Sequence, residues 1–383
     1  MSVTGMMQIA GHEVQGEGAA FRAVNASAGS ALDTDFRSAS RDQLEAACAA
    51  AEAAFTDFSR SSTEVRAALL EAIGANIIEI GDALIERSMA ESGLPRGRLE
   101  GERMRTVNQL RAFAMLLRSG DIGITRIDKA DTGRTPAPKP DLRLTQRALG
   151  PVAVFSASNF PLAFSVAGGD TAAALAAGCP VIVKAHSAHP GTSELVARAI
   201  RLAVADAGLP DGVFSMLFDA GFEIGQGLVA DPRIQAVGFT GSRRGGLALM
   251  DIAARRAQPI PVYAEMSAIN PVILLPHRLE AQAEATGAAF AGALTLGAGQ
   301  FCTNPGLVLA LAGPALDRFV DAAAAAIEGA PGAPMLTPGI LDAYEAGKKR
   351  LEESADVSRK AAGQAGAGCG AGALFVAEAA TFL

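Results

Sequence analysis

Apolar positions in the first third of the chain recur at the spacing of helices. Ser40 can cap a helix that runs to about Arg60 and has one apolar face. Further helices are predicted over about 63–92 and 98–118, with Pro95 between them. The first third of the chain is therefore expected to be mainly helical.

From residue 150 onward, short apolar runs alternate with amphipathic segments that end near Gly178 and Gly208. Apolar runs that alternate with helices predict parallel strands joined by right-handed crossovers. The predicted fold class is therefore α/β, with a doubly wound sheet. The apolar runs occupy residues 152–155, 181–183, 213–218, 234–239 and 262–264.

Residues 120–140 interrupt this pattern and are rich in Gly, Pro, Asp and Lys. Short alternating stretches flank them at 122–127 and 142–149, which predicts a projecting hairpin rather than a linker between domains.

After about Pro259 a second α/β unit is expected. Strands are predicted at 271–275 and 307–311, with a helix through the Ala-rich run between them. A last short strand is predicted at 373–376, and no closing helix is expected after it.

Composition narrows the class of partner. The net charge is −7 and no long basic block is present, which argues against nucleic acid or an anionic membrane surface as a partner. Trp is absent, so aromatic stacking platforms for bases are not expected. The N-terminus lacks the pattern of a signal peptide, and the apolar run at 285–299 is too short to span a bilayer of roughly 30 Å.

The four cysteines lie far apart in the sequence and do not suggest a disulfide framework. The four histidines do not complete a metal-ligand spacing with them, so no metal site is predicted. Together these features favour a cytoplasmic protein.

Cys302 lies in the first segment that could carry chemistry, Gly-Gln-Phe-Cys-Thr at 299–303. It follows a helix of small residues and precedes a loop with a proline. The neighbouring glycines allow backbone and ligand to approach closely. Cys302 can be a nucleophile or a buried core residue, and the local sequence alone favours the core residue.

Two polar residues follow predicted strands. Glu265 ends an apolar strand, where a buried carboxylate would have a raised pKa suited to a general base; a glutamate that reaches solvent is the alternative. Asn159 follows the strand that ends near Phe155, at the edge where open α/β sheets bind ligands. Its amide could stabilise an oxyanion, although Asn and Pro are also favoured in plain turns.

Two further segments could hold a nucleotide. Lys184 follows an apolar strand, and Gly241-Ser242 should begin a helix whose N-terminal amides favour phosphate. The glycine pattern that starts at Gly225 is interpreted as helix, because a dinucleotide-binding pattern requires an immediate turn from strand to helix.

In this order, the five segments resemble those of the aldehyde dehydrogenase superfamily, from about residue 8 to the end. The resemblance implies a Rossmann-type cofactor domain, a second α/β catalytic domain, NAD(P)⁺ as cofactor and an aldehyde as small-molecule substrate. It implies that the Cys302 thiolate attacks the aldehyde and that the Asn159 amide and the Cys302 N–H hold the oxyanion. Glu265 would then activate the water that releases the acid.

The resemblance also implies cofactor contacts. Lys184 would contact the adenine ribose, and Ser242 the pyrophosphate. Many relatives that prefer NAD⁺ carry a glutamate where this chain has Ser187, so a 2′-phosphate is not repelled and NADP⁺ is expected to be accepted, with Arg243 as a further contact. The implied cofactor-binding residues are Lys184, Ser187, Gly241, Ser242 and Ser158.

The segment after Glu265 reads Met-Ser-Ala where the family usually has two glycines. With the segments around Asn159 and Lys184, this variation resembles the 2,5-dioxovalerate (α-ketoglutaric semialdehyde) dehydrogenases. Their substrate ends in an α-keto carboxylate, which calls for a cationic or amide-lined pocket. Arg111 and Phe160 are the candidate substrate contacts, and a surface role on its helix is the alternative for Arg111.

The family architecture assigns residues 1–118 and 147–258 to dinucleotide binding, 119–146 to an oligomerisation hairpin and 259–383 to the catalytic domain. Family members continue well beyond this end, so we expect a truncated catalytic domain, which leaves assembly into a dimer or tetramer open. Three functions stay open: an active NADP⁺-linked dehydrogenase, a truncated chain that at most binds dinucleotide, and a coenzyme-A-acylating relative, against which Glu265 argues.

Overall fold

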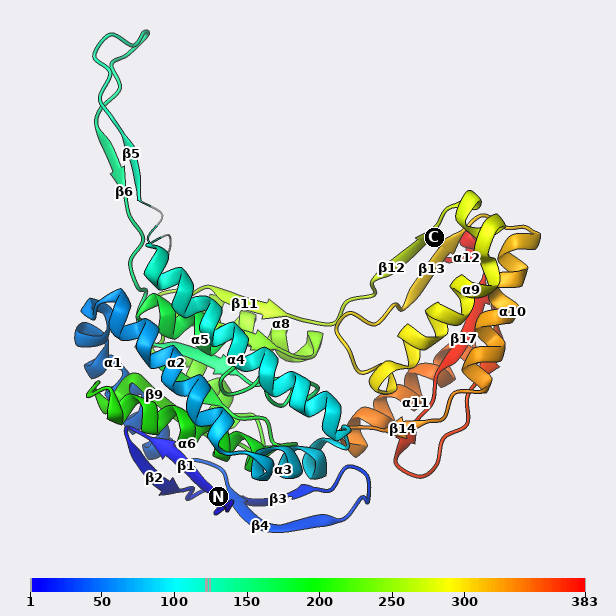
Figure 1. Ribbon diagram of the computed structural model, residues 1–383, viewed down its shortest axis with the longest axis horizontal. Coiled ribbons are helices and arrows are strands. Elements are labelled where there is room, and N and C mark those ends of the chain that lie inside the picture. The colour runs from blue at the N-terminus through cyan, green and yellow to red at the C-terminus, as the bar shows by residue number, and fades with distance from the viewer. Residues whose placement is uncertain (1, 121–122, 124, 383) are drawn as a thin grey trace. The chain divides into compact units, whose positions relative to one another are not determined.

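The structure, a computed structural model, describes residues 2–120, 123 and 125–382 (Figure 1). The chain forms two compact units. The boundary expected at Pro259 lies after Glu265, because the strand that ends there pairs with the sheet of the first unit. The first unit contains residues 2–23, 33–87 and 96–265, and the second contains 24–32, 88–95 and 266–382.

One sheet organises the first unit. In spatial order its strands are β11 (Val262–Glu265), β10 (Ala236–Thr240), β7 (Val152–Phe155), β8 (Val181–Lys184), β9 (Phe214–Leu217), β1 (Met6–Ile9) and β2 (His12–Gln15). The strands from β11 to β9 are parallel. Every residue of β9 is buried, as in a sheet covered by helices on both faces. The predicted doubly wound parallel sheet is confirmed.

The helices that connect these strands agree with the sequence pattern. They are α5 (Gly169–Ala177), α6 (Pro190–Asp206), α7 (Glu223–Ala230) and α8 (Arg243–Ala254), with a short 3-10 turn, η2 (Asp211–Val213), before β9. Gly178 ends α5 with a left-handed φ of 86°. Gly225 lies inside α7, which confirms that its glycine pattern is helical.

The first helical region is α1 (Arg41–Arg60), α2 (Thr63–Glu79), α3 (Asp82–Ser92) and α4 (Arg96–Ser119). Ser40 caps α1, as predicted, and the Gln43 side chain completes a reciprocal cap that the sequence analysis did not anticipate. The single helix predicted over 63–92 is wrong: Gly81 takes a φ of 67°, which separates α2 from α3. Helices α2 and α4 pack against each other and against α5 (Figure 1).

Four strands precede α1, which the prediction of a mainly helical first third did not anticipate: β1, β2, β3 (Ala20–Val24) and β4 (Ala31–Arg37). A buried ion pair fastens the segment before β1. The Glu194 carboxylate, fully buried in α6, accepts hydrogen bonds from Thr4 N at 2.9 Å and Gly5 N at 2.8 Å. Arg198 pairs with Glu194 and donates to Ser2 O at 2.7 Å. Side chains of α6 thereby hold the start of β1, which lies between β9 and the edge strand β2.

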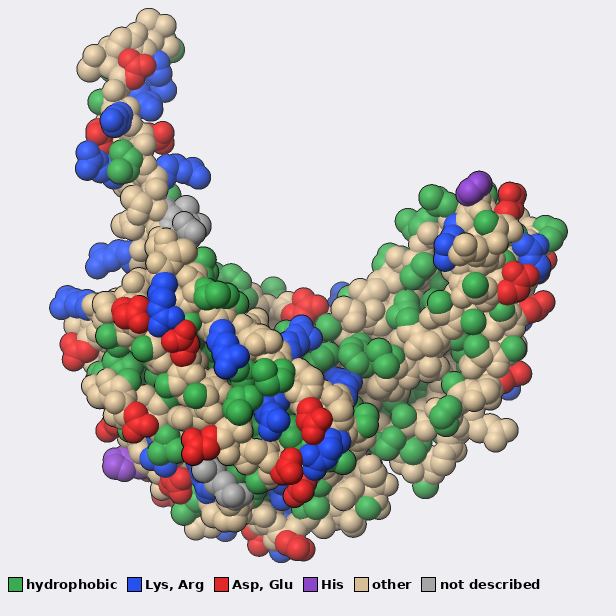
Figure 2. Space-filling model, viewed as in Figure 1, with side chains coloured by type: hydrophobic (Ala, Val, Ile, Leu, Met, Phe, Trp, Pro, Cys, Tyr) green, Lys and Arg blue, Asp and Glu red, His purple; other side chains and the backbone are tan. Residues whose placement is uncertain are grey.

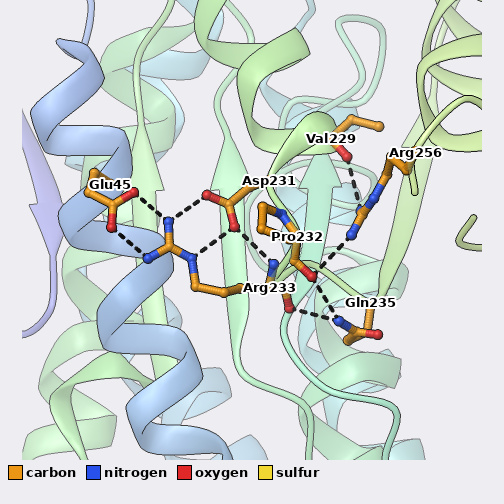
Figure 3. Close-up of polar contacts among 7 residues, drawn as sticks. All are labelled: Glu45, Val229, Asp231, Pro232, Arg233, Gln235 and Arg256. Carbon is orange, nitrogen blue, oxygen red and sulfur yellow. Dashed lines mark hydrogen bonds and ion pairs between the residues drawn. The ribbon is translucent and has the colours of Figure 1, made fainter. Parts of the chain in front are cut away.

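Figure 3 shows how the connection from α7 to β10 is held. The guanidinium of Arg233 makes a two-pronged contact with Glu45 of α1, at 2.7 and 2.5 Å, and also binds Asp231. Arg256 donates to the carbonyl oxygens of Val229 and Pro232. These contacts anchor the start of β10, whose other end carries the candidate phosphate-binding turn.

The predicted hairpin is present as β5 (Arg126–Asp128) and β6 (Leu142–Leu144), which pair antiparallel. The predicted strand 122–127 lies partly outside the described residues. All residues of β5 and β6 are exposed, among them Ile127 at 53% and Leu144 at 54%. Figure 2 shows that the hairpin carries both basic and acidic side chains.

The second unit contains several small sheets and long helices. Its elements are β12 (Pro271–Leu274), α9 (Pro276–Thr295), η3 (Leu296–Gly299), β13 (Leu307–Ala310), α10 (Pro314–Glu328), β14 (Ala333–Pro334), α11 (Pro338–Glu352), β15 (Val357–Ala362), β16 (Cys369–Gly370), β17 (Ala373–Ala377) and α12 (Ala379–Phe382). The expectation that no helix follows the last strand is wrong, since α12 does.

Helices α9 and α10 form the core of the second unit together with the parallel pair β12 and β13. One cluster of buried residues contains Leu274, Leu279, Ala283 and Phe319, and a second contains Ala291, Ile327 and Ala361. Gly287 allows the two helices to approach closely, because an added Cβ would lie 2.4 Å from the carbonyl oxygen of Phe319. In the described part of the chain, no helix is long and apolar enough to cross a membrane.

Candidate active site

The carboxyl ends of the parallel strands bring several predicted residues to one edge of the first unit. Phe155, the last residue of β7, is in register with Lys184 of β8 and with Phe239 of β10. Thr240 is in register with Glu265 of β11. The residues that follow these strands therefore share the edge where open α/β sheets bind ligands.

The turn that carries Asn159 is held by α4. Asn159 and the neighbouring Ser158 are half-buried. Arg98 donates from Nη2 to the carbonyl oxygen of Asn159 at 3.0 Å. The Glu102 carboxylate accepts from the backbone N–H groups of Leu162 at 2.8 Å and Ala163 at 3.0 Å.

Burial raises the pKa of Glu102, while these backbone donors and then the nearby arginines oppose the shift. A nearly buried carboxylate that accepts backbone hydrogen bonds fixes the turn firmly in place.

A second contact ties this turn to the loop after β8. The Nε2 atom of His189 lies 2.8 Å from the carbonyl oxygen of Ala157, and its Nδ1 atom lies 3.2 Å from the hydroxyl of Ser193. Because a carbonyl oxygen only accepts, Nε2 must carry the proton. His189 therefore joins the turn of Asn159 to the loop that carries Ser187.

Lys184 ends β8 as a partly buried cation. Burial lowers the pKa of its ammonium group, and the Asp219 carboxylate opposes this shift. Asp219 itself accepts from the backbone N–H groups of Ile224 and Gly225, at the start of α7. Ser187 is half-buried three residues after Lys184. Burial also lowers the pKa of His186 well below its usual range, so this ring is neutral near pH 7.

The turn after β10 forms the predicted helix start. Ser242 caps α8 and accepts from Gly245 N at 3.1 Å. Gly241, Ser242 and Arg243 are exposed, so the first amides of α8 and a cationic side chain face solvent. An added Cβ on Gly241 would lie 2.7 Å from the ring of Phe239, so the glycine lets this ring pack against the turn. This arrangement suits an anionic group such as a pyrophosphate.

Glu265 lies at the exposed end of β11, and its carbonyl oxygen accepts from Gly241 N at 3.0 Å. The side chain of Glu265 is therefore not buried within the first unit, contrary to one of the two interpretations of the sequence. The alternative, a strand-end glutamate that reaches solvent, describes its environment better.

Cys302 is half-exposed in a loop of the second unit, not buried in the core. The Asn270 amide donates to the carbonyl oxygen of Cys302 at 2.7 Å and to that of Asn304 at 2.9 Å. Gln300 accepts from Leu336 N at 3.0 Å, and the Asn304 amide donates to Leu294 O at 2.7 Å. Three side-chain amides thus fix the backbone on both sides of the thiol.

The two substrate candidates differ in environment. Phe160 is buried to 8% exposure, and its ring packs edge-to-face on Phe164 at 5.1 Å. Arg111 is exposed on α4. The pKa of the Glu71 carboxyl is lowered chiefly by its hydrogen bonds to Arg118, and the charge of Arg111 adds only a small part. The environment of Arg111 is that of a helix-surface residue.

Sequence reasoning missed the residues that hold these turns. Arg98 and Glu102 on α4, His189 and Asn270 all bind backbone groups of candidate site segments. A signal existed for Glu102, because it occupies an apolar helix face at the spacing of Leu99 and Thr106. Comparable signals for the other three are absent, since their partners lie far away in sequence.

Comparison with known proteins identifies the family. Residues 14–339 match the aldehyde dehydrogenase family. The chain is 55% identical, over its full length and 74% of the relative, to an "Alpha-ketoglutaric semialdehyde dehydrogenase 2" of Azospirillum brasilense. It is 47% identical, over 86% of the chain and 62% of the relative, to an "Alpha-ketoglutaric semialdehyde dehydrogenase" of Acinetobacter baylyi. The chain belongs to the aldehyde dehydrogenase family.

Solved structures share the fold. A NAD-dependent benzaldehyde dehydrogenase from Corynebacterium glutamicum superposes with a TM-score of 0.80 at 24% identity, over 97% of this chain and 79% of that one. A salicylaldehyde dehydrogenase from Pseudomonas putida superposes with a TM-score of 0.82 at 19% identity, over 99% of this chain and 77% of that one. The predicted aldehyde dehydrogenase-like α/β fold is confirmed.

Proposed function

We propose that this chain is an oxidoreductase that converts 2,5-dioxovalerate to 2-oxoglutarate with NAD(P)⁺. The observation that carries the proposal is the 55% identity, over the whole chain, with an enzyme named for this semialdehyde. The Met-Ser-Ala segment after Glu265, singled out in the sequence, supports the same substrate.

The proposed chemistry assigns one role to each of three residues. The Cys302 thiolate adds to the aldehyde carbon, and the Asn159 amide and the Cys302 N–H stabilise the oxyanion. Bound NAD(P)⁺ supplies the hydride acceptor, and the acyl group stays on sulfur as a thioester. Glu265 takes a proton from water, which attacks the thioester, releases the acid and restores the thiol. Its exposure leaves room for that water.

The first unit fits a dinucleotide. Three features support the proposal that the first unit binds a dinucleotide: the shared carboxyl edge of the sheet, the exposed amides at the start of α8 and the ammonium group of Lys184. We propose Lys184, Ser187, Gly241, Ser242 and Ser158 as its contacts. The half-buried Ser187 hydroxyl, with Arg243 exposed on α8, favours acceptance of NADP⁺ because neither repels a 2′-phosphate.

The parts of the chain take different roles in this proposal. Residues 1–118 and 147–258 would bind dinucleotide, 259–383 would carry the nucleophile, and the 119–146 hairpin would join subunits into a dimer or tetramer. The exposed apolar side chains of β5 and β6 support that last role. The four free cysteines support a cytoplasmic location.

The test is rapid mixing of the chain with NADP⁺, and separately with NAD⁺, and 2,5-dioxovalerate, followed by absorbance at the band of the reduced cofactor. We expect a burst with the wild type and none with Cys302→Ala. Cys369→Ala is a matched control, because Cys369 is also half-exposed in the second unit.

A burst that survives in Cys302→Ala would remove Cys302 from the mechanism. A folded wild type that gives no burst with either cofactor would overturn the proposed activity and favour a chain that at most binds dinucleotide.

A further inference from the structure

Three charged residues share one face of α4 beside the turn of Asn159. Arg98, Glu102 and Arg105 are spaced by four and then three residues, which places their side chains along one line of the helix. Two of the three bind this turn directly: Arg98 donates to Asn159 O, and Glu102 accepts from Leu162 N.

The charges of this cluster do not cancel. Glu102 is 4% exposed and lies 3.8 Å from Arg98. Arg105 is exposed and has no ion pair anywhere in the described part of the chain. Two guanidinium groups therefore share one carboxylate, and the positive charge left over belongs to the residue that solvent reaches.

Arg105 is nevertheless held in position. Its guanidinium carbon lies 4.8 Å from the ring centroid of Phe164 and 5.6 Å from that of Phe160. Stacking on aromatic rings uses the flat face of a guanidinium and leaves its N–H edge open. An N–H edge with this orientation can donate two parallel hydrogen bonds to a carboxylate.

We propose that Arg105 binds the carboxylate of the substrate, which lies at the opposite end of the substrate molecule from the aldehyde. The inference rests on the proposed function and names the residue that selects acidic aldehydes. Phe160 follows Asn159, the proposed oxyanion donor, and its ring packs on that of Phe164, the ring that lies nearest to Arg105.

This assignment replaces Arg111 as the substrate cation. Arg111 lies six residues further along α4, which is about 9 Å along the helix axis. The guanidinium of Arg105 stacks on the rings of Phe164 and Phe160, next to the turn of Asn159, whereas the charge of Arg111 acts on Glu71 of α2.

The first experiment compares KM for 2,5-dioxovalerate with KM for pentanal, a neutral aldehyde of the same chain length. For Arg105→Met we expect KM for 2,5-dioxovalerate to rise about tenfold to hundredfold, the usual cost of a lost charged hydrogen bond. KM for pentanal should change less than about twofold. Arg105→Lys should recover part of the loss, because it keeps the charge without the two-pronged geometry.

Two further variants test whether the change in KM is specific to Arg105. Arg60→Met, an exposed arginine on α1, serves as the neutral control. Arg111→Met tests the rival position. The proposal is overturned if the loss of selectivity follows Arg111→Met, if Arg105→Met changes both aldehydes equally, or if it changes neither.

A binding measurement separates this inference from the proposed activity. Calorimetric titration with 2-oxoglutarate, the expected product, requires no turnover. Weaker binding by Arg105→Met than by the wild type supports the carboxylate site even if 2,5-dioxovalerate is not oxidised. Equal binding by both, or none by the wild type, overturns it.

Discussion

The two units bury their strands to very different degrees. In the first unit every residue of β9 and the first three of β8 are buried. In the second, β12 buries only its last residue and β17 none. Strands covered on both faces have continuous apolar sequences. Partly covered strands leave some large apolar side chains in contact with solvent, such as that of Ile273, which is 69% exposed.

The helices show the same contrast. In α6 most residues are buried, including the ion pair of Glu194 and Arg198, whereas α11 has no buried residue. The stability of the first unit therefore depends in part on polar groups that are buried and hydrogen-bonded in its interior. The stability of the second depends on the close packing of α9 against α10, so the two units should respond to different kinds of substitution.

The largest effect is expected from Glu194→Ala in the first unit. It removes the acceptor for Thr4 and Gly5 and leaves the nearly buried Arg198 with only the more exposed Glu13 as an acidic partner. The free energy of unfolding should fall by about 3–5 kcal/mol, as measured by urea denaturation. Glu223→Ala, which breaks the exposed pair with Arg41, should cost at most about 1 kcal/mol. Equal losses would refute the contrast between buried and exposed pairs.

An intermediate effect is expected from Gly287→Ala in the second unit. The new methyl group would press on the carbonyl oxygen of Phe319 and force α9 away from α10, at a cost of about 1–3 kcal/mol. Gly292→Ala in the same helix meets no atom within 4 Å and should stabilise it by about 0.5–1 kcal/mol. Thermal unfolding of the two variants measures whether each substitution lowers or raises stability. A destabilised Gly292→Ala would contradict close packing as the cause of the loss in Gly287→Ala.

The smallest effect concerns pH. Because burial raises the pKa of Glu102, the folded chain keeps a proton that the unfolded chain has lost, so this residue's contribution to stability falls as pH rises from about 4.5 through the raised value. Glu102→Gln removes this titration and keeps one oxygen for Leu162 N and Ala163 N. Relative to the wild type, the variant should gain on the order of 1 kcal/mol across this range.

Urea titrations of Glu102→Gln at successive pH values, with the half-exposed Glu100→Gln as control, measure that gain. A difference from the wild type that does not change with pH would show that Glu102 does not titrate in this range.

The sequence predicted the elements whose pattern is unambiguous. Strands β7 to β10 and their helices were found because continuous apolar runs mark strands covered on both faces. The short run of β11 was found as well, although that strand is partly exposed. Strands β2 and β4 were missed because they are mostly exposed and carry many polar residues. The break at Gly81 was missed because one glycine inside a helical pattern is normally tolerated.

The candidate site was predicted in part for a related reason. The motifs that contain Asn159 and Cys302 are local in sequence, so their recognition does not require the fold. The residues that hold them are not local: Glu102 binds a backbone N–H 60 residues away, and Asn270 binds a carbonyl 32 residues away. Contacts over such separations arise only when the helices and strands have assembled.

The contact between Thr4 and Glu194 also has a consequence for synthesis of the chain. The two residues are 190 positions apart, so the first strand must wait for its anchor. At a ribosomal rate of about 5–20 residues per second, that delay lasts on the order of 10–40 s. During this time β1 can pair only with the short strand β2, because β9 and the anchor in α6 have not yet been synthesised. The amino terminus, although synthesised first, is therefore among the last parts of the first unit to fold.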